Sequence, residues 1–473
     1  MSTSPHDTFS VLKEKIRGEL ILPDSPGYDE ARTIWNAMID KRPAAIVRCS
    51  CVADVVAAVN FTRETGILVA VRGGGHNIAG NALCDDGLVI DLSQLKTVRV
   101  DSVSRRAFVG PGATLADVDR ETQAFGLATP LGINSTTGIS GLTLGGGFGW
   151  LTTQYGMTVD NLVSARVVTA DGSTLRASAD ENSDLFWALR GGGGNFGIVT
   201  EFEFQLHPVG PEILAGLIVY PISEAKSVLQ QLRAYLASAP SNLNVWTVVR
   251  QAPPLPFLPT EVHGRPIIAL AVFFSGDTAE GQTLIAPLRT FGNPYGEHLG
   301  VQPYTRWQQA FDPLLTLGAR NYWKSHNFST LPDAVFDCVL EYAGRFPSPH
   351  CEIFIGRLGG AAARVAPDAM AYGNRDANFV MNVHGRWNTP QEDATCIAWA
   401  REFFHASAKY ATGGVYVNFM THDGVDRISS AYGSNYDRLA HLKAKYDPYN
   451  LFRVNQNIIP TPEHEPPWTA NRG

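Results

Sequence analysis

The sequence has little of what marks a secreted or membrane-spanning protein. Its 473 residues contain six scattered cysteines, and none of them stands in a CxxC pair. Neither a disulfide framework nor a cysteine metal site is therefore predicted. No apolar run reaches the length of a membrane span, and the N-terminal residues carry charges where a signal peptide would need an apolar core. We expect a cytoplasmic protein with free thiols, no membrane association and no bound metal.

Positive charge is also scarce. The chain has 38 Lys and Arg against 45 Asp and Glu, a net charge of −7, and no basic block. This balance argues against nucleic acid as the main partner. A length of 473 residues predicts two or three folding units. We expect a monomer or homodimer that acts on a small molecule.

What is abundant is glycine, first in the segment 71–80, VRGGGHNIAG. Three consecutive glycines follow an apolar run and precede His76. Glycine allows positive φ and close approach of a ligand, so this loop is suited to turn its N–H groups toward an anion such as a pyrophosphate. Arg72 would fix one arm of the loop. The alternative is an ordinary glycine-rich turn with a solvated histidine.

A second glycine-rich segment, residues 130–149, reads PLGINSTTGISGLTLGGGFG. Its many backbone donors and hydroxyls need partners if it is buried, so we expect it to wrap a flavin or a nucleotide. A third group, Gly192, Gly194 and Gly197, matches GxGxxG. The order there is helix, glycines, strand, which is the reverse of the dinucleotide-binding fingerprint, so that interpretation is rejected.

The remaining pattern predicts an α+β fold in three parts. Residues 1–209 are expected to form one domain with a core over about 40–209, with a strand through Val71, a helix capped by Thr114 and a hairpin across Asp171 and Gly172. Residues 210–410 are expected to form a second domain in which strands alternate with amphipathic helices, the strands being predicted at 217–220, 245–249, 267–274, 351–355 and 379–387. We expect the second domain to hold a sheet backed by helices on one side. Residues 411–473 form a C-terminal segment, with a strand predicted at 411–419 and a helix at 425–446.

Four motifs in order, RGGGHNIAG, STTGISGLTLGGGFGWL, DLFWALRGGGGNFGIVT and DPYNLFRVNQNI, resemble the berberine-bridge-enzyme-like branch of the vanillyl-alcohol-oxidase flavoprotein family. The resemblance covers nearly the whole chain and is strongest to bacterial members of the 6-hydroxy-D-nicotine oxidase and aclacinomycin oxidoreductase type. It implies a PCMH-type FAD-binding domain of two subdomains and a substrate domain whose antiparallel sheet roofs the flavin. The C-terminal segment would return to the FAD domain.

The resemblance further implies that FAD is bonded covalently to His76. Many plant relatives use a second, cysteine linkage, and Asn134 stands where that cysteine would be. A single linkage is therefore expected. The residues expected to hold FAD are Arg72, Gly73, Gly74, Gly75, His76, Asn77, Gly80, Gly132, Ser135, Thr136, Thr137, Gly138, Gly141, Gly145, Gly146, Trp150, Ile198, Val199, Asn455 and Asn457.

The expected reaction is hydride abstraction from a CH–OH or CH–NH carbon of a small organic substrate to flavin N5. The plant segment YINY, which supplies a catalytic tyrosine, corresponds here to residues 416–419, YVNF, so Tyr416 and Asn418 are catalytic candidates. His384 is a further candidate for the base. The alternative for His384 is an exposed polar face of a half-buried strand. Trp150, Tyr155, Trp323 and Trp387 are candidates for pocket walls, or simply core.

The electron acceptor is predicted from one position. Relatives carry a gate three residues after the attachment cysteine, where valine resembles oxidases and leucine resembles dehydrogenases. The corresponding residue here is Thr137, close to valine in size, which predicts an oxidase that passes electrons to O2 and forms H2O2. A dehydrogenase with another acceptor and a flavin-binding protein without turnover are the alternatives.

Overall fold

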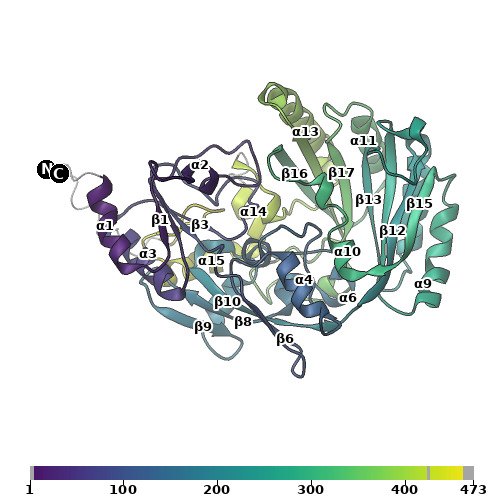
Figure 1. The fold of residues 1–473 in the computed structure, drawn as a ribbon. Helices are drawn as coiled ribbons and strands as arrows, with labels where there is room; N and C mark the ends of the chain where they lie inside the picture. The colour runs from purple at the N-terminus through teal and green to yellow at the C-terminus, as the bar shows by residue number, and fades with distance from the viewer. Residues whose placement is uncertain (1–4, 423–426, 462–473) are drawn as a thin grey trace.

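The computed structural model describes residues 5–422 and 427–461, and its strands form separate sheets (Figure 1). The α+β class predicted from the sequence is confirmed. A four-stranded sheet has the order β1-β2-β4-β3, in which β2, β4 and β3 are parallel. Its strands and its crossover helix are β1 (Glu19–Ile21), β2 (Ala45–Arg48), β3 (Val69–Arg72), β4 (Leu88–Asp91) and α3 (Val52–Thr65).

The second sheet is five-stranded and antiparallel, in the order β5-β6-β10-β8-β9. It consists of β5 (Val98–Asp101), β6 (Arg106–Val109), β8 (Leu162–Val168), β9 (Thr174–Ser178) and β10 (Ile198–Gln205). The predicted hairpin across Gly172 joins β8 to β9, with φ of 84° at that glycine. Helix α4 (Leu115–Gln123) begins at Thr114, whose side chain accepts from the N–H of Asp117 in a capping box, as the sequence predicts.

The third sheet has seven antiparallel strands in the order β15-β12-β14-β13-β17-β18-β16. They are β12 (Glu212–Pro221), β13 (Leu243–Gln251), β14 (Pro266–Phe274), β15 (Gly296–Pro303), β16 (Arg320–Phe328), β17 (Glu352–Arg357) and β18 (Phe379–Trp387). The sequence predicted the antiparallel sheet but not β15 or β16. The domain boundaries at 209 and 410 stay a prediction.

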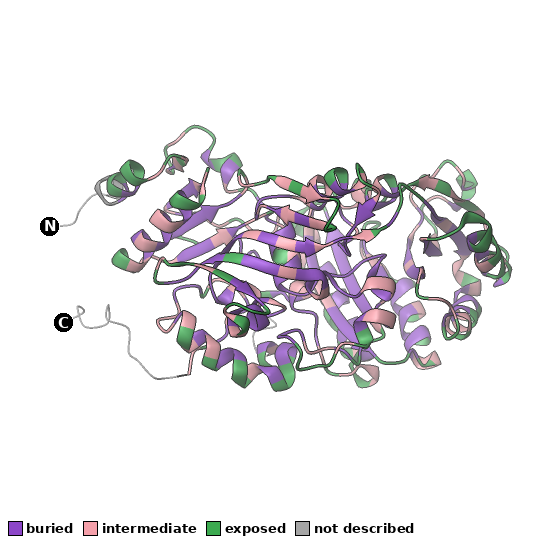
Figure 2. Ribbon diagram, turned by 90° about the horizontal axis from the view of Figure 1, so that it is seen from below, coloured by how far each residue is buried: buried purple, intermediate pink, exposed green. Residues whose placement is uncertain are grey.

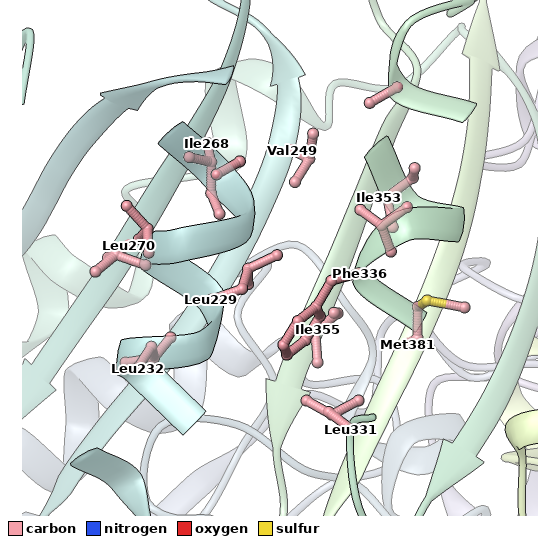
Figure 3. Packing of buried hydrophobic residues seen from close by; sticks show 14 of the residues in the cluster. Leu229, Leu232, Val249, Ile268, Leu270, Leu331, Phe336, Ile353, Ile355 and Met381 are labelled. Atoms are coloured by element: carbon pink, nitrogen blue, oxygen red, sulfur yellow. The ribbon is translucent and has the colours of Figure 1, made fainter. Parts of the chain in front are cut away.

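Helices cover one face of this sheet. They are α8 (Ala225–Leu236), α11 (Asp333–Ala343) and α13 (Asp393–Ser407). Figure 3 shows Leu229 and Leu232 of α8 on the side of the sheet that carries Leu270, and Phe336 of α11 beside Ile355. Figure 2 shows that buried residues run along the strands, while exposed residues gather on the outer sides of helices. Because side chains alternate along a strand, every second residue points to the other face, away from these helices.

The C-terminal segment lies among elements of the first 200 residues (Figure 1). Helix α15 (Tyr436–Tyr446) contacts α7 (Ser183–Leu189), and Lys443 binds the carbonyl oxygen of Asn195 at 2.8 Å. The predicted strand 411–419 is wrong. Gly413, with φ of 89°, interrupts any extended run, and Val417–Phe419 is a single 3-10 turn.

The predicted helix 425–446 is also broken. Its first residues lie outside the described part of the chain, and α14 (Ile428–Tyr432) is separated from α15 by Gly433, with φ of 53°. Among the described residues, no helix combines the length and apolarity needed to cross a membrane.

A buried ion pair lies where the C-terminal segment packs against the first 200 residues. Lys443 and Asp447 are buried, with Nζ and Oδ2 2.6 Å apart. We predict that Asp447→Asn lowers the free energy of unfolding by about 3 kcal/mol or more, because it leaves a buried charge without its partner. Lys445→Gln, which removes the exposed pair with Asp184 on the same helix, should cost below about 1 kcal/mol. Urea unfolding measures both variants, and equal effects would contradict the assignment.

Candidate functional site

A cavity of about 480 Å³ lies between the glycine-rich segments and the face of the seven-stranded sheet that the helices leave free. Its lining includes residues of the loop 73–77, of 132–150, of 193–199 and of 307–315, the strands of the large sheet, and the C-terminal residues 416–419 and 454–456. Residues hundreds of positions apart therefore share one enclosed space.

The first glycine loop begins where β3 ends, at Arg72. Arg72 was expected to help hold FAD, but its side chain contacts other residues of the protein. Its guanidinium pairs with the buried Asp91, with Nη2 and Oδ2 2.6 Å apart, and also binds the carbonyl oxygen of Ala31. Arg72 does not line the cavity. It fixes the loop from behind, as the sequence analysis expected for one arm of the loop.

The two glycine segments touch backbone to backbone. An ideal Cβ on Gly74 would lie 2.4 Å from the N of Gly138, and one on Gly138 would lie 2.3 Å from the N of Gly74. Neither position therefore tolerates a side chain. Gly75 has φ of 69°, so the left-handed backbone of this loop is at Gly75 and not at Gly74.

His76 stands at the cavity wall, with its ring stacked on Trp35 at a centroid distance of 5.2 Å and an interplanar angle of 21°. Its Nε2 lies 3.0 Å from Oγ1 of Thr136. The hydroxyl and the N–H of Thr136 both donate to Oδ1 of Asn134, at 2.7 and 3.1 Å. Because that hydroxyl proton is engaged, Thr136 accepts from His76, so Nε2 carries the hydrogen and Nδ1 keeps its lone pair.

Desolvation by the surrounding protein lowers the pKa of His76 to about 4. The imidazole is therefore neutral at pH 7. A neutral ring with one nitrogen donating to Thr136 and a free lone pair on the other is a nucleophile.

The second segment contributes a short helix, α5 (Ile139–Leu144), between its glycines. Gly145 has no room for a side chain, because an ideal Cβ would lie 2.2 Å from Oδ1 of Asn418. Ser135 binds Asp312 through its N–H and its hydroxyl, at 2.9 and 2.6 Å, so it points away from the cavity.

Tyr416 and Asn418 come from the C-terminal segment and line the cavity, although neither lies on a strand. The phenol oxygen of Tyr416 accepts from the N–H of Gly147 and from Nδ2 of Asn418, both at 3.0 Å. Burial raises the pKa of Tyr416 to about 12. The phenol is therefore neutral at pH 7.

His384 lies on the sheet, in a line of residues across β13, β17, β18 and β16 that we call the charged row: Arg250, Glu352, His384 and Trp323. All four line the cavity. Arg250 Nη1 is 2.7 Å from Glu352 Oε2, and His384 Nδ1 is 3.2 Å from Glu352 Oε1. His384 is only 2% exposed, so the alternative of an exposed polar strand face is wrong.

The protonation of this row follows from its contacts. Burial opposes ionisation of Glu352, but Arg250 and the bond from His384 outweigh it and hold the pKa of Glu352 at about 2. Burial lowers the pKa of His384 despite the neighbouring carboxylate. The other nitrogen, Nε2, faces Oδ1 of Asn321 at 3.1 Å. Both imidazole nitrogens thus face acceptor oxygens.

Two of the four predicted aromatic wall residues line the cavity, Trp150 and Trp323. The other two do not. Tyr155 stacks on His207 at 4.0 Å, and Trp387 packs under the helices on the opposite face of the sheet, with its Nε1 donating to Asp393.

Most of the residues expected to hold FAD share the cavity wall. These are Gly73, Gly74, Gly75, His76, Asn77, Gly132, Thr137, Gly138, Gly141, Gly145, Trp150, Ile198, Val199 and Asn455. Those that do not line it are Arg72, Gly80, Ser135, Thr136, Gly146 and Asn457. Thr136 still acts on the site through His76.

Arg250 and Glu352 were not among the residues predicted from the sequence. A signal existed, since Glu352 interrupts the apolar strand 351–355 and Arg250 ends the apolar run 245–249. An isolated charge on an otherwise apolar strand needs a partner if it is buried. The pairing of β13 with β17 supplies that partner, and strand order cannot be obtained from the run itself.

The cavity leaves room at the glycine segments for a ligand that carries both apolar and anionic groups. A Cβ added at Gly141 or Gly194 would meet no protein atom within 4 Å, so both glycines open onto free space. Oδ1 of Asn455 is buried without a partner in the described part of the protein. Among the described lining residues, the cationic side chain is Arg250, on the sheet, so an anion at the glycine loops would rest on backbone N–H groups. FAD has this composition.

Comparison with known proteins points the same way. Residues 43–178 match a family described as "FAD binding domain", and residues 415–459 match one described as "Berberine and berberine like". The chain is 32% identical to an uncharacterised FAD-linked oxidoreductase of Bacillus subtilis, over 95% of this chain and 98% of that one. It is 31% identical to (R)-6-hydroxynicotine oxidase of Paenarthrobacter nicotinovorans, over 94% and 97% of the two chains.

The solved structure of 6-hydroxy-D-nicotine oxidase from Arthrobacter nicotinovorans is similar in fold, with a TM-score of 0.84 and 29% identity. The match covers 98% of this chain and all of that one.

The open space at Gly141 provides a test of the site. We predict that Gly141→Val leaves the fold intact but reduces the flavin content of the purified protein to about a tenth or less, because the new side chain enters the volume of the ligand. A tenfold loss corresponds to about 1.4 kcal/mol of binding free energy. Visible absorbance per protein and the melting temperature measure the two effects. Gly300→Val, which also meets open space but lies outside the cavity, is the control. Full flavin content in the Gly141 variant would contradict this site.

Proposed function

Because the chain belongs to the berberine-like FAD-linked oxidoreductases, we propose that it is an oxidase whose FAD is attached through His76 alone. The observation that carries this proposal is the single cavity that joins the His76 loop to the polar face of the seven-stranded sheet. One end suits a flavin nucleotide, and the other presents charged and aromatic side chains to a substrate.

When bound, FAD supplies the N5 atom that accepts a hydride from a CH–OH or CH–NH carbon of the substrate, and O2 then takes the two electrons with two protons to give H2O2. The protein has to orient that carbon, exclude water and receive the proton. The aromatic and aliphatic lining of the cavity limits water there.

The proton is assigned to the His384–Glu352 pair. Glu352 is an ionised carboxylate at the cavity wall, and it would stabilise a proton taken up by His384, whose Nδ1 lies 3.2 Å from Oε1 of Glu352. The oxygen of the neutral Tyr416 phenol accepts hydrogen bonds from Gly147 and Asn418, so its own hydrogen points away from these two donors. That hydrogen is the one we assign to orienting a ligand.

Attachment through one residue is supported by the state of His76. The ring is neutral, and the hydrogen bond to Thr136 leaves Nδ1 as the nitrogen with a free lone pair. Asn134, at the position of the plant cysteine, is engaged with Thr136 and offers no second linkage.

We predict that wild-type protein stays yellow after acid precipitation and fluoresces at its band on a denaturing gel, whereas His76→Ala releases its flavin. Thr136→Val should slow attachment of FAD to apoprotein by about tenfold, because the imidazole loses the acceptor that fixes its tautomer. Thr136→Ser, which keeps the hydroxyl, should restore the rate. Release of all flavin from denatured wild type would refute the covalent attachment.

The choice of O2 as acceptor depends on Thr137, which lines the cavity beside His76 and Gly138. We predict that dithionite-reduced enzyme reoxidises rapidly in air-saturated buffer, and that Thr137→Leu slows this step by at least about tenfold, or about 1.4 kcal/mol in the barrier. Stopped-flow absorbance measures the rate. Slow reoxidation of the wild type would favour the dehydrogenase alternative, and an unchanged rate in the leucine variant would remove Thr137 as the gate.

A further inference from the structure

The cavity face of the large sheet carries a second line of residues next to the charged row. Strand pairing sets Val248 beside Phe354, Phe354 beside Asn382, and Asn382 beside Ser325. We call these four residues the middle row. Asn382 is its polar member at the cavity wall, flanked along β18 by His384 of the charged row.

Asn382 is fully buried, and among the described residues neither its amide oxygen nor its amide nitrogen has a hydrogen-bond partner. Two other buried amides on this face each have at least one hydrogen-bond partner. Nδ2 of Asn244 donates to the carbonyl oxygens of Gly149 and Trp150, and Oδ1 of Asn321 accepts from Arg386. A buried amide without partners destabilises the fold, so such a group in a cavity wall is accounted for by a ligand that bonds to it.

The chemistry of Asn382 restricts that ligand. A carboxamide does not titrate, and it presents one acceptor and one donor in the same plane. Its complement is a neutral group that also has a donor beside an acceptor. The charged neighbours of Asn382 do not compete for this neutral ligand group, because Glu352 is already paired with Arg250 and His384.

The walls around Asn382 are flat and apolar. The rings of Trp246 and Phe354 are nearly parallel, 5.7 Å apart with an interplanar angle of 7°. Gly356 makes room for this arrangement, because an ideal Cβ there would lie 3.2 Å from the ring of Trp246. Flat aromatic walls favour a planar, apolar ligand body over a sugar, whose hydroxyls would each need a partner.

We propose that the substrate is a planar aromatic or heteroaromatic molecule that carries a neutral donor–acceptor pair, such as a carboxamide or lactam, and that Asn382 is the specificity-determining residue that bonds to this pair. The inference rests on the proposed function, since it takes this cavity as the substrate site of the flavoenzyme.

Two non-reacting probes of similar size and shape test the inference. Benzamide has both donor and acceptor, whereas acetophenone has only the acceptor. Calorimetric titration of the purified flavoprotein, checked by the shift of the flavin absorption bands, gives the dissociation constants. Benzamide should bind at least about tenfold more tightly than acetophenone, because acetophenone leaves the amide oxygen of Asn382 unbonded.

Variants assign that preference to Asn382. Asn382→Leu should abolish the difference between the two probes. Asn327→Leu is the matched control, since Asn327 is also fully buried with both amide atoms unpartnered but does not line the cavity. It should keep the wild-type preference. Should the Asn382 variant fail to fold, the comparison of the two probes on wild type still decides.

Equal binding of the probes to wild type, a preference that survives in Asn382→Leu, or tighter binding of xylobiose than of benzamide would each overturn the inference. Flavin content and denaturation of the same samples test the proposed function separately. Yellow protein without the preference refutes only the inference about Asn382, whereas purified protein that cannot hold flavin refutes the proposed function.

Discussion

The site depends on the direct backbone contact between Gly74 and Gly138. A side chain on either glycine would overlap the backbone of the other. This contact holds the loop after β3 against the second glycine segment, in which Oγ1 of Thr136 lies 3.0 Å from Nε2 of His76. The tautomer of the histidine, and with it the position of the free lone pair, is therefore set by a segment about sixty residues further along the chain.

The large sheet separates two environments by the alternation of its strands. On β18, Met381 and Val383 pack under the helices, while Asn382 and His384 face the cavity. One face is thus an ordinary apolar core, and the other is a polar surface that is nevertheless buried. Burying charges is costly unless they are paired, and the charged row meets this condition by placing Glu352 between Arg250 and His384. The same pairing removes Glu352 from competition for a neutral ligand.

Much of the fold and of the candidate site was predicted from the sequence. The strand around Val71, the loop with His76, and β18 with its polar alternate residues were predicted because local patterns dictate them. The features that failed depend on long-range contacts. The segment with Tyr416 has a strand-like composition, but Gly413 bends it and no sheet edge receives it. Arg72 was expected at the ligand, yet its charge is neutralised by Asp91 on the neighbouring parallel strand, and that neighbour is known only once strand order is known. Glu352 was not predicted for the same reason, because its partner Arg250 lies on a strand whose place beside it is known only from the strand order.

The order of assembly follows from where the site residues come from. The loop with His76 is in the first hundred residues, the charged row is in the third sheet, and Tyr416 and Asn418 arrive with the C-terminal segment, which Lys443 and Asp447 fasten to the first part of the chain. The oxygen of Tyr416 accepts the N–H of Gly147, so the C-terminal segment also completes the hydrogen bonds of the second glycine segment. The reactive state of His76 needs Thr136 and Asn134 in place. In a chain whose glycine segments are not yet packed together, His76 lacks the contact that sets its tautomer, so the proposed bond to FAD would follow the packing of these two segments rather than guide it.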